Sequence, residues 1–239
     1  MTMSDRYRTA WDGFWAESSG EPGEPFWDAD PTLSARRDLD HLDPYADRSL
    51  PIADLGCGNG TQTRFLATRF ARAVGVDLSA AAVAHARRAD PEGIATYEQL
   101  NLANPAEADD LHERLGDTNV YMRAVLHQSD PEDRPAVAAS VAQLVGTHGR
   151  ALVLEPTGEA KEVIAAVAAR PGGPSPKLRR VKEHDLHPGE VAEGEVAALL
   201  RAAGLTVLDE GAAALTMSET HPDGTPVELP GRWFVAGRP

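Results

Sequence analysis

Three glycines spaced two residues apart, Gly56, Gly58 and Gly60, are the clearest sign of chemistry in the sequence. They lie in residues 52–61, IADLGCGNGT, where an apolar strand-like stretch leads into a helix-like one. Glycine lets the backbone turn tightly and approach a ligand without a Cβ clash, and a helix N-terminus adds unpaired N–H groups. A dinucleotide-binding loop would carry its third glycine at position 61, but that residue is Thr61. The segment therefore predicts a nucleotide-binding turn of another kind.

A carboxylate ends the next predicted strand. Asp77 stands in the segment GVDLS, and parallel strands bring it to the same sheet edge as the glycines. An acid at this place can accept hydrogen bonds from both hydroxyls of a ribose. Its alternative role, capping the helix that follows, suits Ser79 better. We expect Asp77 to bind a ribose.

Two further titratable residues follow later strands and are the candidates for catalysis. His127 comes just after the strand predicted at 120–124, and its ordinary pKa range suits a general base near neutral pH. Alternatively, it caps the turn or packs beneath a ligand. Glu155 ends the strand predicted at 150–155, where its carboxylate can position an amine or a hydroxyl, or bind water.

Strand-like and helix-like segments alternate between residues 50 and 155, which predicts a parallel, doubly wound α/β sheet. The predicted strands are 52–55, 73–77, 96–100, 120–124 and 150–155, and the predicted helices are 61–70, 80–88, 107–115 and 135–145. Beyond them we expect a helix at 159–170, a loop at 171–176, a helix at 190–203, and two closing strands at 205–210 and 232–237.

The first fifty residues hold seven of the thirteen aromatic residues. Trp11, Phe14 and Trp15 have the spacing of one helix face. That face can pack on the main domain and also line a substrate pocket, and the residues expected there are Tyr7, Trp11, Trp15 and Trp27. We therefore predict an N-terminal helical cap over residues 1–49 and a main domain over 50–239.

Residues 158–188 read as a lid-like insertion. His184 and His187 are expected to reach the pocket from this lid; a metal site on the same residues is the weaker reading, and no metal is predicted. Residues 177–182, KLRRVK, indicate a solvated loop or helix end, with a small anion contact as the alternative. The other histidines, His85 among them, are expected to face solvent.

The formal charge of −14 argues against binding of nucleic acid. No apolar run has the length of a membrane span. A single cysteine, Cys57, excludes an internal disulfide framework, so a cytoplasmic location is the default. We expect a monomer or a homodimer.

Three motifs in order, DLGCGNG, VGVDLS and NVYMRAVLHQ, make residues 50–155 similar to the conserved half of class I S-adenosylmethionine-dependent methyltransferases. The resemblance implies a sheet in the order 3-2-1-4-5-7-6 with strand 7 antiparallel, and S-adenosylmethionine as cofactor. It assigns the amino-acid end of the cofactor to Asp54, Gly56, Gly58 and Gly60, with Cys57 and Asn59 in the same loop. Asp77 would bind the ribose, followed by Leu78. Asn101, where the family usually has Asp, and Leu102 would contact the adenine, and Arg123 would border the methionine moiety.

The resemblance implies a methyltransferase, and the aromatic cap and the insertion favour a small-molecule acceptor methylated on oxygen or nitrogen. Other hypotheses are a non-catalytic S-adenosylmethionine-binding protein, a protein methyltransferase and, on fold alone, a nicotinamide-dependent dehydrogenase. Nucleic-acid methylation is disfavoured by the charge and by the segment RAVLHQ, which replaces the Asn/Asp-Pro-Pro-Tyr/Phe signature after strand four.

Overall fold

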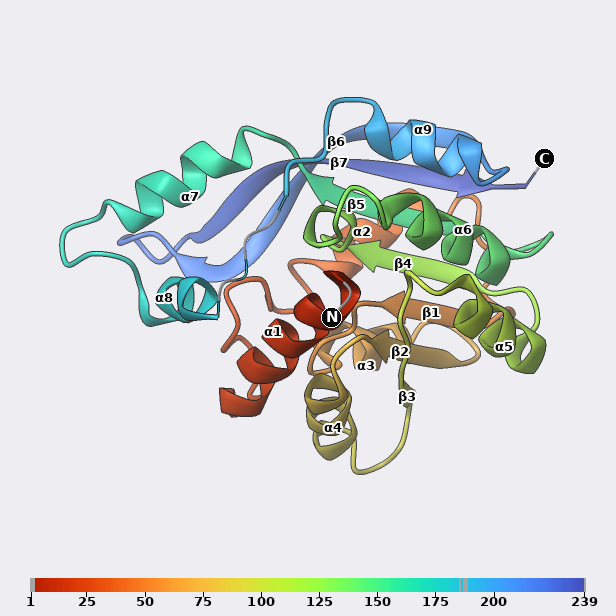
Figure 1. The fold of residues 1–239 in the computed structure, drawn as a ribbon, viewed down its shortest axis with the longest axis horizontal. Coiled ribbons are helices and arrows are strands. Elements are labelled where there is room, and N and C mark those ends of the chain that lie inside the picture. Colours follow the sequence, from red (N-terminus) through yellow and green to blue (C-terminus); the bar gives the residue numbers. More distant parts are fainter. Residues whose placement is uncertain (1–2, 185, 187–188, 239) are drawn as a thin grey trace.

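The computed structural model describes residues 3–184, 186 and 189–238, which fold around a seven-stranded sheet (Figure 1). The strand order is β3-β2-β1-β4-β5-β7-β6. β7 is antiparallel to both of its neighbours, whereas the other pairs are parallel. This confirms the fold that the resemblance implied.

The strands are β1 (Ile52–Leu55), β2 (Ala73–Asp77), β3 (Thr96–Gln99), β4 (Asn119–Arg123), β5 (Ala151–Pro156), β6 (Thr206–Thr220) and β7 (Pro226–Gly237). The helices are α1 (Met3–Glu17), α2 (Ala35–Leu42), α3 (Thr61–Leu66), α4 (Ala80–Ala89), α5 (Pro105–Leu115), α6 (Arg134–Val145), α7 (Ala160–Ala168), α8 (Pro176–Glu183) and α9 (Glu195–Ala202), with a short 3-10 turn η1 (Leu126–Gln128) after β4.

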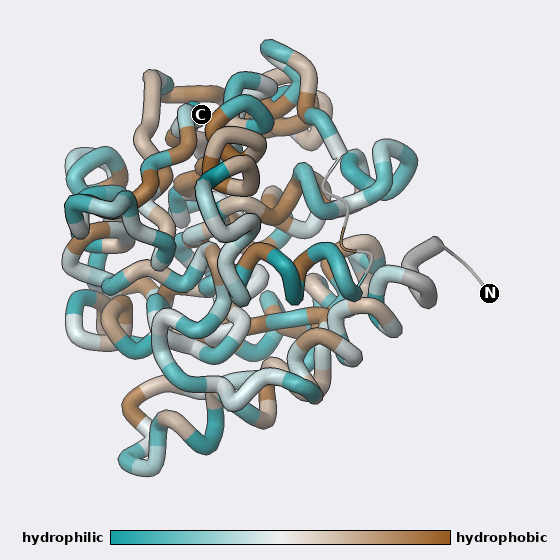
Figure 2. The backbone as a smooth tube through the Cα atoms, turned by 90° about the vertical axis from the view of Figure 1, so that its left-hand side faces the viewer, coloured by the Kyte–Doolittle hydropathy of each residue, from teal (hydrophilic) through white to brown (hydrophobic). Residues whose placement is uncertain are grey.

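The central strands are buried along most of their length because helices cover both faces of the sheet. All four residues of β1 are buried, as is usual for a parallel strand between two helical layers. Ile52 and Tyr121 face a core shared with α2, α3 and α7, while Ala53 and Met122 face a second core shared with α5, α6 and α9. In Figure 2 the hydrophobic segments run mainly through the interior. None of the described helices is long and apolar enough to cross a membrane.

The N-terminal helix α1 lies against α4 rather than against the middle of the sheet. Asp12 Oδ1 accepts a hydrogen bond from Ser79 Oγ at 2.6 Å, and His85 Nε2 lies 2.8 Å from the carbonyl oxygen of Trp15. His85 is only 8% exposed, so the expectation that it faces solvent is wrong. The helix α2, which the sequence analysis did not predict, buries Ala35, Leu39 and Leu42 despite its many charges.

The chain after β5 departs most from the predicted elements. Helix α9 begins at Glu195 rather than at residue 190, and residues 177–182 belong to α8 rather than to a loop or helix end. Strands β6 and β7 form one long hairpin that continues well beyond 205–210 and 232–237. A Cβ at Gly211 would come within 2.8 Å of Trp233 Nε1, so this glycine makes room for a tryptophan and does not end the strand. The outer part of the hairpin, α7 and α8 form the left side of Figure 1.

Candidate functional site

A cavity of about 350 Å³ lies at the carboxyl edge of the parallel strands. One part, which we call the glycine-loop side, is lined by Gly56, Gly58, Asp77, Asn101 and Leu102. The other part, which we call the apolar side, is lined by nine residues from position 156 onward: Pro156, Ile164, Leu178, Val181, Lys182, Leu186, Leu215, Met217 and Leu229. The turn after β4 lies in the wall of the same cavity. Its size is typical of a small-molecule site.

Two of the three loop glycines line this cavity. Gly56 and Gly58 have φ values of 75° and 54°, and a Cβ at Gly58 would stand 2.8 Å from the ring of Trp15. Side chains at these positions would fill the cavity, so the loop leaves a cradle for a ligand. Gly60 lines neither this cavity nor its smaller neighbour: a Cβ there would meet Tyr97 at 2.7 Å, so Gly60 allows close packing of the loop on the ring.

Asp77 reaches the cavity from the end of β2. Its Oδ2 accepts a hydrogen bond from the Gly58 N–H and its Oδ1 one from the Ser79 N–H, both at 2.9 Å. Burial, with a smaller contribution from the charge of Asp12, raises the pKa of Asp77 to about 6. Ser79 caps α4 by accepting a hydrogen bond from Ala82 N, which leaves the Asp77 carboxylate for a ligand. Leu78 lines the cavity beside it.

A smaller cavity of about 50 Å³ adjoins the glycine loop and contains Asp54, Cys57, Asn59 and Arg123 in its wall. Asp54 accepts a 2.6 Å hydrogen bond from Thr63 Oγ1, and burial, with a smaller effect of the Asp77 charge, raises its pKa to about 7. Asn59 Nδ2 donates to Asp28 Oδ2 at 2.8 Å, so its side chain ties the loop to the N-terminal region. Burial raises the pKa of the Cys57 thiol well above its ordinary value, which disfavours the nucleophilic thiolate.

Arg123 ends β4 and lines both cavities. Its Nη2 donates to the carbonyl oxygen of Thr216 at 2.8 Å, and its Nε lies 3.5 Å from Asp38 Oδ2. Tyr121 OH also donates to Asp38 Oδ2, at 2.6 Å. The guanidinium is thus largely neutralised inside the protein and joins α2 to the β6–β7 hairpin.

The turn after β4 is organised by the carboxylate of Glu155. Ala124, at φ 62°, is the only non-glycine residue with positive φ in the described chain, and it begins the turn. Glu155 then accepts hydrogen bonds from the backbone N–H groups of Val125, Leu126 and His127 at 2.8, 2.7 and 3.2 Å. Glu155 is 2% exposed and does not line the cavity, so its geometry does not fit the expected direct contact with a ligand.

His127 lines the cavity from this turn, as does Asp130. Its Nδ1 lies 2.8 Å from Glu155 Oε2, and its Nε2 lies 2.8 Å from Gln128 Nε2. An ionised carboxylate only accepts, so Nδ1 carries the proton. The Gln128 amide then donates to the lone pair of Nε2, so another group reaches this lone pair only by displacing the amide or inserting between the two side chains. This pairing of imidazole and buried carboxylate is suited to taking up a proton at Nε2.

Asn101 and Leu102 lie where the sequence places them, in the cavity wall after β3. Asn101 Oδ1 accepts a hydrogen bond from the Ala103 N–H at 3.0 Å, and the Leu102 carbonyl oxygen accepts one from Ser140 Oγ at 2.8 Å. These contacts fix the loop against α6.

The aromatic residues of the N-terminal region gather over the glycine loop. Tyr7, Trp11, Trp15 and Trp27 all line the cavity, and Trp11 and Trp27 pack edge to face with centroids 5.4 Å apart. Phe14, which shares the helix face, is buried beneath them. The two readings of the aromatic face, packing and pocket lining, are therefore both realised.

Of the two histidines expected to reach the pocket, the one that the structure describes lies elsewhere. His184 does not line the cavity: its Nε2 lies 3.0 Å from Glu17 Oε2 and its ring packs on Phe14. His187 lies outside the described residues. Within the described chain, no group of three or more His, Cys, Asp or Glu residues is arranged to hold a metal ion.

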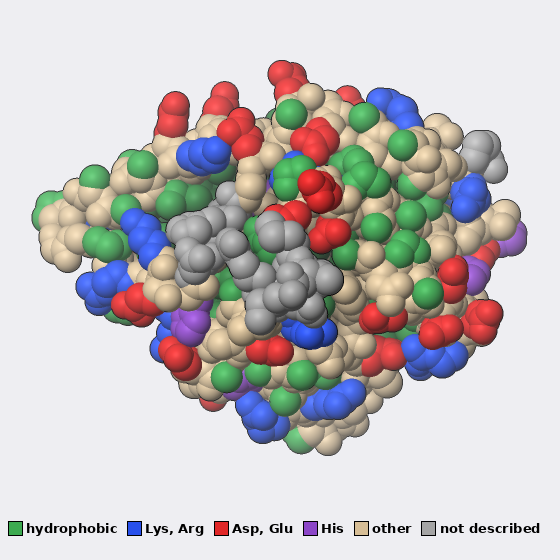
Figure 3. Space-filling view, viewed as in Figure 1, with side chains coloured by type: hydrophobic (Ala, Val, Ile, Leu, Met, Phe, Trp, Pro, Cys, Tyr) green, Lys and Arg blue, Asp and Glu red, His purple; other side chains and the backbone are tan. Residues whose placement is uncertain are grey.

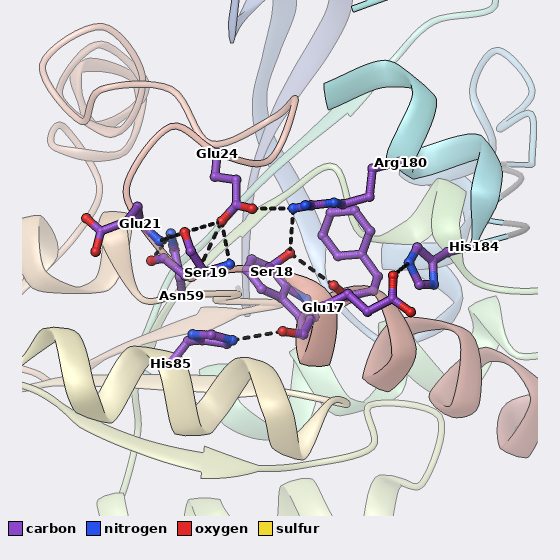
Figure 4. A network of polar contacts seen from close by, with 12 residues as sticks. Glu17, Ser18, Ser19, Glu21, Glu24, Asn59, His85, Arg180 and His184 are labelled. Atoms are coloured by element: carbon purple, nitrogen blue, oxygen red, sulfur yellow. Dashed lines mark hydrogen bonds and ion pairs between the residues drawn. The ribbon is translucent and has the colours of Figure 1, made fainter. Parts of the chain in front are cut away.

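The N-terminal region and the insertion are joined by ion pairs (Figure 4). Arg180 of α8 forms an ion pair with Glu24, and His184 pairs with Glu17 of α1. We call these two pairs the cap–insertion latch. Lys177 donates to the Ser218 carbonyl oxygen at 2.9 Å, while Leu178 and Val181 line the cavity. The segment KLRRVK is therefore part of an amphipathic helix, α8, that forms one wall of the cavity.

The sequence analysis missed most of the apolar side and, in the turn, the polar residues Gln128 and Asp130 with Ser129 between them. No short motif marks the apolar residues, because they come from α7, α8 and a hairpin whose outer half was not predicted. These polar residues could have been suggested by their place directly after His127.

Comparison with known proteins supports the chemistry suggested by this geometry. Residues 52–149 match the family model of a methyltransferase domain. A crystal structure of an S-adenosylmethionine-dependent methyltransferase from Anabaena variabilis superposes with a TM-score of 0.87 at 26% identity, covering 100% of this chain and 96% of that one. No curated protein matches the chain significantly.

More distant structures share the fold. Magnesium protoporphyrin IX methyltransferase from Synechocystis with bound S-adenosylmethionine gives a TM-score of 0.60 at 16% identity, covering 100% of this chain and 98% of that one. A protein described for the conversion of a disulfide bond into a thioacetal group during echinomycin biosynthesis gives 0.68 at 17%, covering 97% and 92%. With the glycine cradle, Asp77 and the strand order, these findings make S-adenosylmethionine the cofactor. Residues 52–149 thus form a methyltransferase domain, and the chain has the fold of the class I S-adenosylmethionine-dependent methyltransferases.

Proposed function

We propose that the protein methylates an oxygen or nitrogen of a small metabolite held between the glycine loop and the apolar side of the cavity. The observation that carries this proposal is the continuity of one cavity from Gly56, Gly58 and Asp77 to Leu178, Met217 and Leu229. Such a cavity lets a cofactor and an acceptor meet beside the turn that holds His127.

The cofactor would be held by the glycine-loop side. Gly56 and Gly58 offer backbone close to the amino-acid end, near Asp54 and Arg123, and Asp77 would accept hydrogen bonds from the ribose hydroxyls. Leu78, Asn101 and Leu102 would enclose the adenine. S-adenosylmethionine, when bound, supplies a methyl group on a sulfonium that a nucleophile can displace in line.

His127 would act as the general base. When the acceptor displaces the Gln128 amide from Nε2, this nitrogen would accept the proton of its hydroxyl or amine, and Glu155 would stabilise the resulting imidazolium through Nδ1. Glu155 is in this proposal a positioning residue. The aromatic cap and the insertion would exclude water from the cavity.

The remaining parts of the proposal concern organisation and partners. Residues 1–49 act as a cap, 50–239 as the catalytic domain and 158–188 as a lid-like insertion. The charge of −14, with basic side chains scattered over the face shown in Figure 3, supports the absence of a nucleic-acid partner. A cytoplasmic location rests on the single, buried cysteine, and the protein is a monomer or homodimer.

The test is a calorimetric titration with S-adenosylhomocysteine and with NAD, followed by incubation with methyl-labelled S-adenosylmethionine and a panel of small hydroxyl and amine compounds. We expect binding of S-adenosylhomocysteine, no binding of NAD, and label in at least one small product. Label found only in added proteins would favour the protein methyltransferase, and cofactor binding without any turnover would favour a non-catalytic role.

A further inference from the structure

Three buried polar side-chain atoms of the described cavity wall lack a hydrogen-bond partner. One is a donor, Arg123 Nε, which lies 3.5 Å from Asp38 Oδ2 in an ion pair, and the other two are acceptors. Gln128 Oε1 and Asp130 Oδ2 are both buried and have no hydrogen-bond partner. Both residues line the cavity, and both belong to the turn that carries His127. A buried acceptor without a donor is costly, so each of these oxygens calls for a hydrogen-bond donor from a ligand.

Gln128 is tied to the proposed base. Its Nε2 donates to His127 Nε2 at 2.8 Å, and its unpartnered Oε1 is bonded to the same amide carbon. A group that approaches His127 Nε2 from the cavity therefore meets the Gln128 amide as well. A hydroxyl can donate to Gln128 Oε1, or it can insert between the two side chains, accepting from the Gln128 N–H and donating to His127 Nε2.

The apolar side of the cavity restricts the rest of the acceptor. Eight of its nine lining residues are hydrophobic, and Leu178, Leu215 and Met217 are at most 4% exposed. None of the nine carries a carboxylate that could pair with a buried ammonium group. A charged acceptor would have to leave water without a partner there, which is unfavourable.

The cations of the cavity wall do not change this conclusion. Arg123 is paired with Asp38 and hydrogen-bonded to the Thr216 carbonyl oxygen. Lys182 is exposed and lies at the rim. Against them stand the carboxylates of Asp77, Asp130 and Asp133 in the same wall, which disfavour an anion.

We infer that the acceptor has an uncharged apolar body and a hydroxyl group, and that Gln128 is the residue that selects the hydroxyl. This inference rests on the proposed function, because it assigns the apolar side to the methyl acceptor. It places the apolar body against α8 and the hairpin, and the hydroxyl beside His127 and Gln128.

A series of naphthalenes with one body and different polar ends tests the inference. We would titrate the protein, with and without S-adenosylhomocysteine, with 2-naphthol, 2-methoxynaphthalene, 2-naphthoate and 2-naphthylmethylammonium in a calorimeter. We expect 2-naphthol to bind best, and both charged compounds to bind at least about tenfold more weakly. The naphthoate must bury its charge, and the ammonium group cannot accept a hydrogen bond from the Gln128 amide. Tightest binding of the naphthoate, lost in Lys182→Ala, or tightest binding of the ammonium compound would overturn the inference.

Variants separate the hydroxyl contact from the apolar contact. Gln128→Met keeps the side-chain length and removes the amide; it should weaken 2-naphthol by about threefold to tenfold and leave 2-methoxynaphthalene unchanged. Leu178→Asn should weaken all four compounds, whereas Leu208→Asn, at a site 36% exposed on β6, should weaken none. Equal losses of naphthol and its ether in Gln128→Met would contradict the role of Gln128.

The proposed function and the inferred acceptor class would be contradicted by different results. If S-adenosylhomocysteine does not bind but 2-naphthol does, with the expected variant pattern, the proposed function is wrong and the hydroxyl-selective apolar site stands. If S-adenosylhomocysteine binds and the naphthol series shows no preference for the hydroxyl, the methyltransferase proposal stands and the acceptor class is wrong.

Discussion

The glycine-loop side of the cavity is built from residues close together in the sequence, whereas the apolar side is assembled from distant segments. Asp77 and Gly58, which are hydrogen-bonded, lie 19 residues apart. On the other side, Arg180 meets Glu24 across 156 residues, and Ser218 meets Pro25 across 193. The first side uses backbone groups and carboxylates; the second uses hydrophobic side chains.

This difference in construction corresponds to two functions of the cavity, binding of the cofactor and binding of the acceptor. The cofactor is always the same molecule, so it is bound by a turn of defined conformation. The backbone N–H groups of that turn tolerate little change in the sequence. An acceptor is enclosed by side chains on peripheral helices and a hairpin, which can differ without disturbing the sheet. The turn after β4 takes part in both functions, because Arg123 and His127 belong to the cavity wall between the two sides.

The largest expected effect is that of a substitution at His127, in the turn after β4. His127→Gln should lower kcat for a hydroxyl acceptor by about 10²- to 10⁴-fold, since a positioned general base contributes about that much. Affinity for S-adenosylhomocysteine should stay unchanged, because the cofactor side does not depend on Nε2. The measurement is steady-state kinetics combined with calorimetry, with the exposed His148→Gln as control. An unchanged kcat would mean that alignment alone is sufficient and that His127 only shapes the turn.

The second prediction concerns the glycine-loop side alone. Asp77→Asn should weaken S-adenosylhomocysteine by about 10- to 100-fold, because it removes charge-assisted hydrogen bonds to the ligand. The fold should persist, since Ser79 still caps α4. Calorimetry and a thermal melt measure both quantities, and Asp109→Asn on the exposed face of α5 is the matched control. Unchanged affinity would refute the assignment of Asp77 to the ribose.

The same difference explains how much the sequence predicts. The strands from β1 to β5 and the loop residues Gly56, Gly58 and Asp77 are recognisable because apolar runs, glycines and a terminal acid follow one another locally. Gly60 shows the limit of this reasoning, since its role as a packing glycine depends on Tyr97, far along the chain.

The apolar side is not recognisable in the same way. The continuation of β6 past Gly211 depends on Trp233 in the partner strand, and the position of His184 depends on Glu17 and Phe14 at the other end of the chain. His85 was expected to face solvent because no residue close to it in the sequence indicates that α1 packs over it. Long-range contacts decide each of these outcomes.

The third prediction tests whether the cap–insertion latch limits the release of S-adenosylhomocysteine. Arg180→Gln should raise the dissociation rate of S-adenosylhomocysteine by about fivefold at most, since a partly exposed ion pair contributes about 1 kcal/mol or less. The side chains of Arg180 and Glu24 are 33% and 23% exposed. Lys161→Gln is the control, because it breaks the similarly charged pair with Glu190 that does not join the cap. Stopped-flow fluorescence of the cavity tryptophans measures the rate. A change equal to that of Lys161→Gln would mean that the latch does not limit release.

The smallest expected effect is a proton linkage on the glycine-loop side. Burial raises the pKa of Asp77 to about 6, so the free protein holds part of a proton there at pH 5.5. Ribose hydroxyls donate hydrogen bonds to the ionised form, so binding lowers this pKa and releases the proton. The sign follows: affinity for S-adenosylhomocysteine rises with pH through 6, by about threefold to fourfold between pH 5.5 and 7. Calorimetry at pH 5.5 in two buffers of different ionisation enthalpy measures the release, which Asp77→Asn should abolish. Proton uptake on binding, or release that persists in the variant, would place the titrating group elsewhere, with Asp54 as the next residue to change because its raised pKa lies closest.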